Sequence, residues 1–130
     1  MMITTKGRNA LKIMIDLARH DGDGFISLAD IAVRQKESLK YLEASAAQLT
    51  SAGLVVSARG KSGGYKLARK PEEYTAAEIL QVGEGTLSPV QCLISGCENA
   101  AECDTLPLFK ELDEVIMNFL NSKTLKDLVQ

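Results

Sequence analysis

The sequence lacks the features that mark membrane and secreted proteins. No apolar run in its 130 residues approaches the roughly 20 residues that a membrane-spanning helix requires. Its first residues lack the apolar stretch and the cleavage site of a secretory signal. We therefore expect a cytoplasmic protein with no membrane partner, in a reducing compartment where clustered thiols serve more often as ligands or redox centres than as structural disulfides.

Histidine and cysteine are also scarce, and the few that occur argue against catalysis. His20 is the only histidine, and no array of general bases accompanies the thiols, which disfavours an enzyme with a cysteine nucleophile. The only cysteines, Cys92, Cys97 and Cys103, fall within twelve residues. An odd number of thiols cannot form a complete set of disulfides, and the glycine and short polar residues between them suit a loop that folds around a ligand.

The net charge of −2 conceals an unequal distribution. Residues 1–70 carry 12 Lys and Arg against 6 Asp and Glu, whereas residues 71–130 carry 3 against 11. A positive half has the minimum electrostatic character that binding a polyanion requires. The acidic half would repel a polyanion and is free for sensing or self-association.

Apolar periodicity and capping residues predict a mainly α-helical chain with one small β-hairpin. Two strand-like runs, 54–58 and 65–68, flank a glycine-rich tip that is typical of a hairpin. The expected helices cover residues 7–19, 27–33, 38–51, 75–83 and 108–120, with a short last helix from Thr124. In the helix over 38–51 the predicted buried stripe comprises Leu39, Leu42, Ala46 and Leu49.

Two short helices about four residues apart, followed by a hairpin, match a winged helix-turn-helix. The second of these helices would enter the major groove of DNA and present Ser38, Lys40, Tyr41 and Glu43. Lys40 and Tyr41 could hold phosphate, and Glu43 could accept a hydrogen bond from a cytosine amino group. Two structural alternatives stay open, a solvated Glu43 and a Tyr41 whose ring packs against the protein.

The hairpin tip is the second candidate DNA contact. An arginine such as Arg59 suits a narrow minor groove, whose negative potential favours a guanidinium group, and glycines let backbone amides approach a phosphate. The predicted contacts in this tip are Arg59, Lys61, Ser62, Gly63 and Gly64.

Several segments resemble the IscR/NsrR/CymR superfamily of bacterial winged-helix regulators, and the resemblance covers nearly the whole chain. These segments are Thr5-Lys-Gly-Arg8, Lys40-Tyr-Leu-Glu43, Ala52-Gly-Leu-Val55, Arg59-Gly-Lys-Ser-Gly-Gly-Tyr65 and Leu87-Ser-Pro-Val90. The resemblance implies a homodimeric transcriptional regulator, such as a repressor, that binds double-stranded DNA at a dyad-symmetric operator. It places Ser38, Lys40, Tyr41, Glu43 and Arg59 at the DNA surface, with Thr5, Lys6 and Arg8 near the DNA backbone.

The same resemblance implies a division of labour along the chain. Residues 1–83 would form the winged helix-turn-helix domain, residues 84–104 a sensor loop, and residues 105–130 a dimerisation helix and tail. The apolar stripe of Phe109, Leu112, Ile116 and Phe119 supports pairing with a second chain, because so small a domain has little of its own surface to cover it. An ordinary core role for this stripe is the alternative.

For the cysteines, the resemblance implies that Cys92, Cys97 and Cys103 hold an iron–sulfur cluster of the 2Fe-2S type. Residue chemistry alone also allows zinc, which the missing Cys-x-x-Cys spacing disfavours, direct thiol redox chemistry, or no ligand. The main alternative is a regulator of cysteine metabolism without metal, controlled by a partner protein or by thiol oxidation.

The fourth ligand of such a cluster is unidentified. The two positions from which relatives supply it hold Leu106 and Arg8 here, and neither residue can ligate. We hypothesise that a carboxylate such as Asp104, or a small exogenous ligand, takes this place. His20 is expected instead to lie at the C-terminus of the first helix, either as a favourable charge at the helix end or as a plainly exposed side chain.

Overall fold

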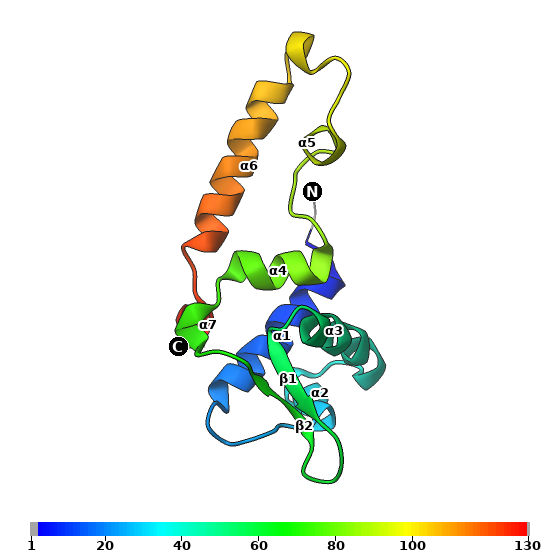
Figure 1. Cartoon of the computed structure of the whole chain (residues 1–130), viewed down its shortest axis with the longest axis vertical. Helices are drawn as coiled ribbons and strands as arrows, with labels where there is room; N and C mark the ends of the chain where they lie inside the picture. The colour runs from blue at the N-terminus through cyan, green and yellow to red at the C-terminus, as the bar shows by residue number, and fades with distance from the viewer. Residues whose placement is uncertain (1–2, 130) are drawn as a thin grey trace.

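Three helices and a hairpin form the lower body of the molecule in Figure 1, a computed structural model that describes residues 3–129. The helices are α1 (Thr5–Arg19), α2 (Leu28–Gln35) and α3 (Leu39–Ser51). Strands β1 (Val55–Ala58) and β2 (Gly64–Leu67) pair antiparallel, with Val55 opposite Leu67 and Ala58 opposite Gly64. The winged helix-turn-helix predicted from the sequence is therefore confirmed.

The rest of the chain crosses the body, leaves it as an arm and returns. A 3₁₀ turn η1 (Pro71–Glu73) leads into α4 (Ala76–Glu84), which lies above α1 in Figure 1. The arm comprises residues 85–121. It contains α5 (Cys92–Ser95), the 3₁₀ turn η2 (Ala100–Glu102) and the long helix α6 (Leu106–Asn121). The short helix α7 (Leu125–Leu128) then docks on the body.

The helix starts follow the capping residues seen in the sequence. The side chains of Thr4, Ser27 and Thr75 accept hydrogen bonds from the amides of Lys6, Asp30 and Glu78. Thr124 and Asp127 form the reciprocal capping box of α7. Ser38 occupies the N-cap of α3, but its side chain makes no capping hydrogen bond within the described structure.

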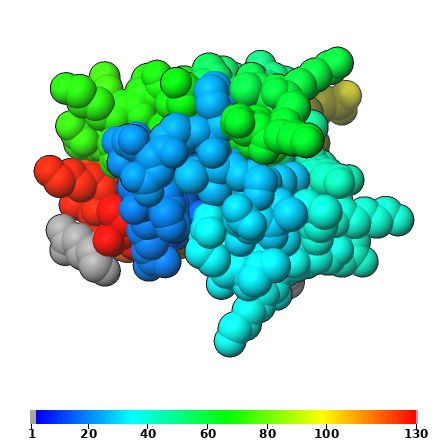
Figure 2. Space-filling model, turned by 90° about the horizontal axis from the view of Figure 1, so that it is seen from below, coloured from blue at the N-terminus to red at the C-terminus, as the bar shows by residue number. Residues whose placement is uncertain are grey.

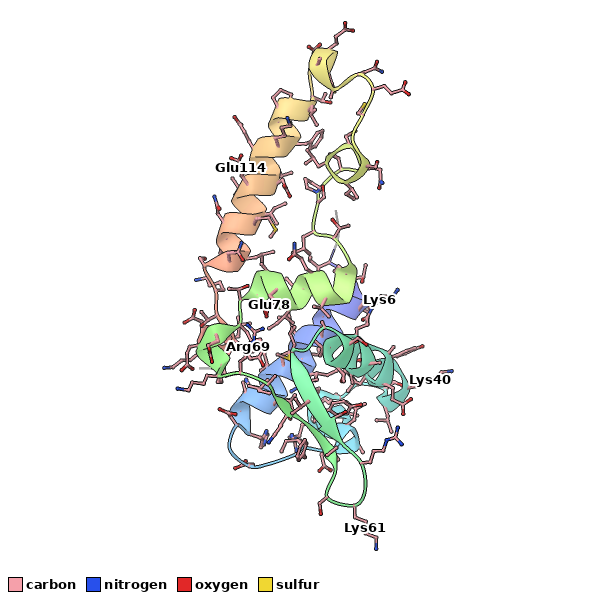
Figure 3. All side chains as sticks on the ribbon, viewed as in Figure 1. Lys6, Lys40, Lys61, Arg69, Glu78 and Glu114 are labelled. Carbon is pink, nitrogen blue, oxygen red and sulfur yellow. The ribbon has the colours of Figure 1, made fainter. Side chains whose placement is uncertain are left out.

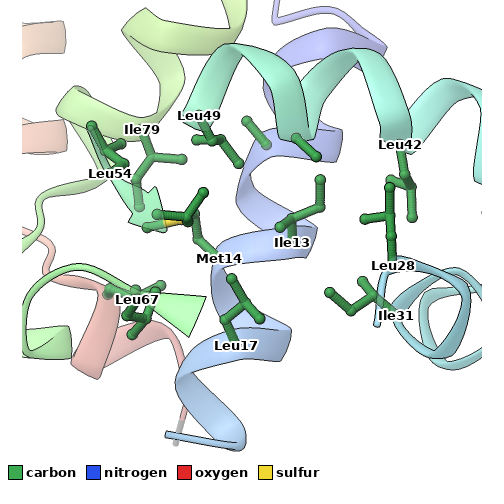
Figure 4. Packing of buried hydrophobic residues seen from close by; sticks show 14 of the residues in the cluster. Ile13, Met14, Leu17, Leu28, Ile31, Leu42, Leu49, Leu54, Leu67 and Ile79 are labelled. Atoms are coloured by element: carbon green, nitrogen blue, oxygen red, sulfur yellow. The ribbon is translucent and has the colours of Figure 1, made fainter. Parts of the chain in front are cut away.

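The core lies between helices α1 to α4 and the hairpin (Figure 4). Ile13 and Met14 of α1, Ile31 of α2 and Leu42 and Leu49 of α3 are each completely buried. One prediction about α3 is wrong: Leu39 is 41% exposed, whereas Ser45 is only 3% exposed. Leu39 is the first residue of α3, at a helix end that is open to solvent, whereas Ser45 is buried in the groove that α3 shares with α1.

Asp16 is a buried charge that ties α1 to α2. Its carboxylate accepts from the Arg34 guanidinium at 2.7 and 3.0 Å and from the Gln35 amide at 3.2 Å. Burial alone would raise the pKa of Asp16, but the hydrogen bonds from Arg34 and Gln35 outweigh it and lower the pKa. The carboxylate is therefore charged at neutral pH and holds the two helices in a fixed relation.

Tyr74 joins the hairpin to the C-terminal helix. Its side chain is completely buried, and its hydroxyl donates to the Leu54 carbonyl at 2.6 Å and accepts from the Arg69 amide at 2.9 Å. Its backbone carbonyl accepts from the Leu125 amide at 3.0 Å. A bridge between Thr75 and Thr124 lies beside this contact, so the segment that follows the arm is fastened to the start of α4. Within residues 3–129, no helix combines the length and apolarity needed to cross a membrane.

Candidate DNA-binding surface and cysteine loop

A groove between the first turns of α1 and the outer face of α3 brings together two of the predicted DNA-contacting segments. The groove has a volume of about 700 Å³. Thr5 and Lys6 line it from α1, and Lys40 and Tyr41 line it from α3. Its remaining lining residues are Asn9, Ala44, Ser45 and Gln48. Two segments more than thirty residues apart in sequence thus form one continuous surface.

The predicted contacts on α3 point away from the core. Ser38, Lys40, Tyr41 and Glu43 are all exposed. The Tyr41 side chain is 63% exposed, which disfavours the alternative in which its ring packs against the protein. Arg8, also exposed, donates a hydrogen bond from its guanidinium to the Thr5 hydroxyl at 3.2 Å, so its charge lies beside the same turn of α1.

The hairpin presents its polar residues at the lower tip of the molecule. Arg59, Lys61 and Ser62 are exposed, and Figure 3 shows Lys61 projecting from the tip while Lys6 and Lys40 project from the side of the body. Figure 2 looks onto this underside, where α2 and α3 in cyan meet the hairpin in green, away from α7 in red. The accumulated positive charge suits a phosphate backbone.

Gly63 and Gly64, predicted to contact DNA, are held in place by packing of the hairpin itself. A Cβ on Gly64, whose φ is +144°, would lie 2.2 Å from the Ile26 carbonyl oxygen, and one on Gly63 would lie 2.3 Å from the Ala58 carbonyl oxygen. This closeness lets Ile26 and Tyr65 exchange two backbone hydrogen bonds of 2.8 Å. The hairpin is thereby joined to the residue preceding the N-cap of α2.

The three cysteines lie in the arm. Cys92 begins α5, Cys97 is exposed in the loop, and Cys103 lies just before α6; Cys92 and Cys103 are half-buried. Between residues 3 and 129, no group of three or more His, Cys, Asp or Glu side chains is placed so that it could hold a metal ion. The predicted convergence of the thiols is therefore not seen. Three thiolates fit soft-metal chemistry as a donor set, but α5 and η2 each fold locally and leave the sulfur atoms apart.

Asp104, the candidate fourth ligand, and two residues that are not expected to ligate, Leu106 and His20, are placed as follows. Leu106 is buried in the first turn of α6, and Asp104 is exposed beside Cys103. His20 is at the C-cap of α1, where its Nδ1 lies 2.9 Å from the Asp16 carbonyl oxygen. The expected position of His20 at a helix C-terminus is therefore confirmed.

Comparison with known proteins identifies the family of this chain. Residues 3–130 match the Rrf2 family, described as iron-dependent transcriptional regulators. The chain belongs to the Rrf2 family. Among its relatives, the transcriptional regulator IscR of Aliivibrio salmonicida is 38% identical over 130 residues, which cover 99% of this chain and 77% of that protein. The expectation of a non-enzymatic, DNA-binding regulator is confirmed by this membership.

Two solved structures of similar proteins show the same fold. CymR of B. subtilis, the global cysteine regulator, is 39% identical, with a TM-score of 0.85 over 99% of this chain and 96% of CymR. IscR of T. potens is 37% identical, with a TM-score of 0.81 over 99% of this chain and 86% of that IscR. The chain thus resembles an IscR and a CymR to a similar degree.

In this Rrf2 chain the surroundings of Cys103 make its thiol more acidic. Hydrogen bonds from the Thr105 hydroxyl, whose Oγ1 lies 3.2 Å from Cys103 Sγ, and from the backbone amides of Thr105 and Leu106 lower the pKa of Cys103 below its ordinary value of 9.0. A larger fraction of Cys103 is therefore thiolate at neutral pH, which favours both metal ligation and alkylation.

We expect Thr105→Val to slow the alkylation of Cys103 severalfold at pH 7, because valine keeps the shape of threonine but cannot donate a hydrogen bond to the thiolate. The rate would be followed with iodoacetamide by mass spectrometry on metal-free protein. Thr86→Val, an exposed threonine at the start of the arm, is the matched control and should leave the rate unchanged. Equal rates for Thr105→Val and the unaltered protein would refute the role of the hydroxyl.

Two residues in or beside the first turns of α1 were not predicted from the sequence as parts of the candidate site. Asn9 lines the groove and is 2% exposed, and its Oδ1 has no hydrogen-bond partner within residues 3–129. A polar residue on the apolar side of α1 is the only signal that could have found it. Glu84 contacts the first turn of α1 across 80 positions, and nothing local in the sequence indicates that contact.

Proposed function

We propose that the protein is a cytoplasmic homodimer that binds a dyad-symmetric DNA operator and responds through Cys92, Cys97 and Cys103. The observation that carries this proposal is the groove shared by α1 and α3, with Lys6 and Lys40 exposed along it, together with the exposed Arg59 of the hairpin tip. Each chain would place α3 in a major groove and the hairpin tip in the neighbouring minor groove. Residues 1–83 would bind DNA, residues 84–104 would sense, and residues 105–130 would dimerise.

The exposed apolar face of α6 supports the homodimer. Val115 is 64% exposed, Leu108 63% and Phe119 59%, and Leu112 lies between them at 41%. The helix stands away from the body of its own chain (Figure 1), so nothing in the described residues covers this face. An identical face on a second copy would bury both, which is the arrangement of a two-fold symmetric dimer.

Arg59→Ala is expected to weaken DNA binding most on sites with A·T-rich flanks, because the narrow minor groove there concentrates the negative potential that a guanidinium group reads. Affinities would be measured by fluorescence anisotropy on two duplexes that share half-sites and differ only in flank composition. Lys61→Ala, at the other cation of the same exposed tip, is the comparison and should weaken binding to both duplexes equally. An equal loss on both duplexes for Arg59→Ala would reassign it to phosphate contact.

For the sensor we propose an iron–sulfur cluster held by Cys92, Cys97 and Cys103, as the resemblance implies. The cluster would supply a centre that oxygen or nitric oxide can alter, and the loop would have to gather the three thiols. The lowered pKa of Cys103 favours its thiolate as a ligand. Asp104, exposed next to Cys103, is the carboxylate available for the fourth position.

Anaerobic purification followed by visible spectroscopy and by iron, sulfide and zinc assays tests this sensor. A coloured protein containing iron and sulfide would support the cluster, and zinc without colour would replace it. If Asp104→Ala leaves the cluster absorption and its lifetime unchanged, Asp104 is not the fourth ligand.

A triple cysteine-to-alanine variant should dimerise but differ from the loaded protein in operator affinity. Equal affinity and site choice would refute sensing by these residues.

A thiol-based regulator without metal is the second candidate, favoured by the likeness to CymR, the global cysteine regulator of B. subtilis. Such a protein would be purified colourless and free of iron, zinc and sulfide. Its operator affinity would change on mild oxidation, or on adding a partner protein, and a reductant would reverse the oxidative change. Absence of any such change would leave this candidate without support.

A further inference from the structure

The carboxylate of Glu84 joins the last residue of α4 to the first turn of α1. Its Oε1 accepts from the Thr4 amide at 2.7 Å and from the Gly7 amide at 2.9 Å, and both of its oxygens lie within 3.0 Å of the Thr4 hydroxyl. The first amides of a helix have no partner within the helix, and α1 has no acidic residue in its own first turn. Glu84 thus supplies from α4 the negative charge that this helix end favours.

Two glycines make the contact close. A Cβ on Gly83 would lie 2.8 Å from the Cα of Gly7, and a Cβ on Gly7 would lie 2.6 Å from Oε1 of Glu84. The backbones of α1 and α4 therefore touch at this point. A close-packed contact of this kind passes displacement from one helix to the other, because there is no gap to absorb it.

Glu84 is held as a carboxylate by this environment. Burial opposes its charge, but the hydrogen bonds from Thr4 and Gly7 outweigh burial and lower the pKa of Glu84. Lys6 contributes a further attraction. The hydrogen bonds are therefore charge-assisted, which makes them stronger than neutral ones.

The contact lies between the two functional regions. After Glu84 the chain turns at Gly85, with φ +86°, and enters the arm that carries the cysteines (Figure 1). On the other side of the contact, Thr5 and Lys6 line the groove shared with Lys40 and Tyr41. One side chain thus connects the base of the arm to residues of the candidate DNA surface.

We propose that Glu84 is a positioning residue that couples the cysteine loop to the DNA-binding surface. Reorganisation of the loop moves the C-terminal end of α4, and Glu84 carries that movement to the first turn of α1 and thus to Thr5 and Lys6. This inference rests on the proposed function, but its test reads the amides of α1 and does not depend on DNA affinity.

Hydrogen exchange of the Thr4 and Gly7 amides, followed by NMR on metal-free protein, tests the coupling. Alkylating the three cysteines with iodoacetamide should change both exchange rates. Glu84→Ala should speed exchange at Gly7 on the order of tenfold by removing a charge-assisted acceptor, and should abolish the response to alkylation. Glu84→Gln keeps an acceptor oxygen and should restore much of the protection. Glu72→Ala, an exposed glutamate on η1, is the matched control and should behave like the unaltered protein.

Two results would overturn the coupling. The first is that alkylation leaves the exchange rates of the α1 amides unchanged in the unaltered protein. The second is that alkylation changes these rates in the Glu84→Ala variant as much as in the unaltered protein. The same samples would be titrated with a duplex enriched by the unaltered protein from a random-sequence library. Alkylation could change the exchange rates of the α1 amides while neither alkylation nor cysteine replacement changes the affinity for this duplex. In that case the sensing function fails while the coupling stands.

Discussion

Val115→Asp should separate the dimer and weaken operator binding by roughly 10²- to 10⁴-fold, the gain that linking two binding modules provides. Val115 is 64% exposed in the single chain, so its replacement removes little core packing. In the proposed dimer it would place an unpaired charge in an apolar interface, which is strongly unfavourable. Light scattering after gel filtration would give the oligomeric state, and fluorescence anisotropy the affinity.

The matched control for oligomeric state and folding is Val33→Asp, the same substitution at a valine of α2 that is 78% exposed. It should stay dimeric and, like Val115→Asp, keep a circular dichroism spectrum of a folded helical protein. A Val115→Asp protein that remained dimeric at micromolar concentration would place the interface on another surface.

Tyr74→Ala should lower the free energy of unfolding by about 3–5 kcal/mol, the cost of removing a large buried aromatic side chain. The ring is completely buried, and the Arg69 guanidinium lies 4.3 Å from its centre. Such a loss is a large part of the roughly 5–15 kcal/mol that stabilises a typical domain. Urea unfolding followed by circular dichroism, at one fixed protein concentration, would measure it.

Tyr74→Phe divides this effect into packing and hydrogen bonding. The variant keeps the ring but leaves the Leu54 carbonyl and the Arg69 amide without the hydroxyl, and should cost about 1–3 kcal/mol. Tyr41→Phe, at a tyrosine that is 63% exposed, should change the stability little. If Tyr74→Ala costs no more than Tyr74→Phe, the ring itself contributes little to stability.

Much of the DNA-binding half could be predicted because its signals are local. Thr4, Ser27 and Thr75 cap their helices through atoms two or three residues away, and the glycine-rich tip determines the hairpin. The prediction of a buried Leu39 was wrong because helical periodicity identifies the apolar side of a helix but not how far along the helix the neighbouring elements cover that side.

The contacts that relate distant segments could not be predicted. Glu84 is a charged residue at the end of α4, where a solvated side chain is the ordinary expectation, and its partners lie 77 and 80 positions away. For the cysteines, spacing gives the number of thiols in the loop but not its path. Whether Cys92 and Cys103 meet depends on how α5, the loop and α6 fold, and short sequence patterns do not determine this.

The hydrogen bonds between Ile26 and Tyr65 bear on how such a regulator would select its sites. They fasten the hairpin to the start of α2, and Asp16 fastens α2 to α1. Each chain would therefore present its helices and its hairpin to DNA as one rigid unit. A signal arriving through the arm would then act at the first turn of α1, which Glu84 contacts, and through α6 on the distance and rotation between two such units, while α2 and the hairpin keep their relation within each. Operators that respond to the signal should therefore differ from unresponsive ones in the length of the spacer between half-sites, while the half-site sequence is shared.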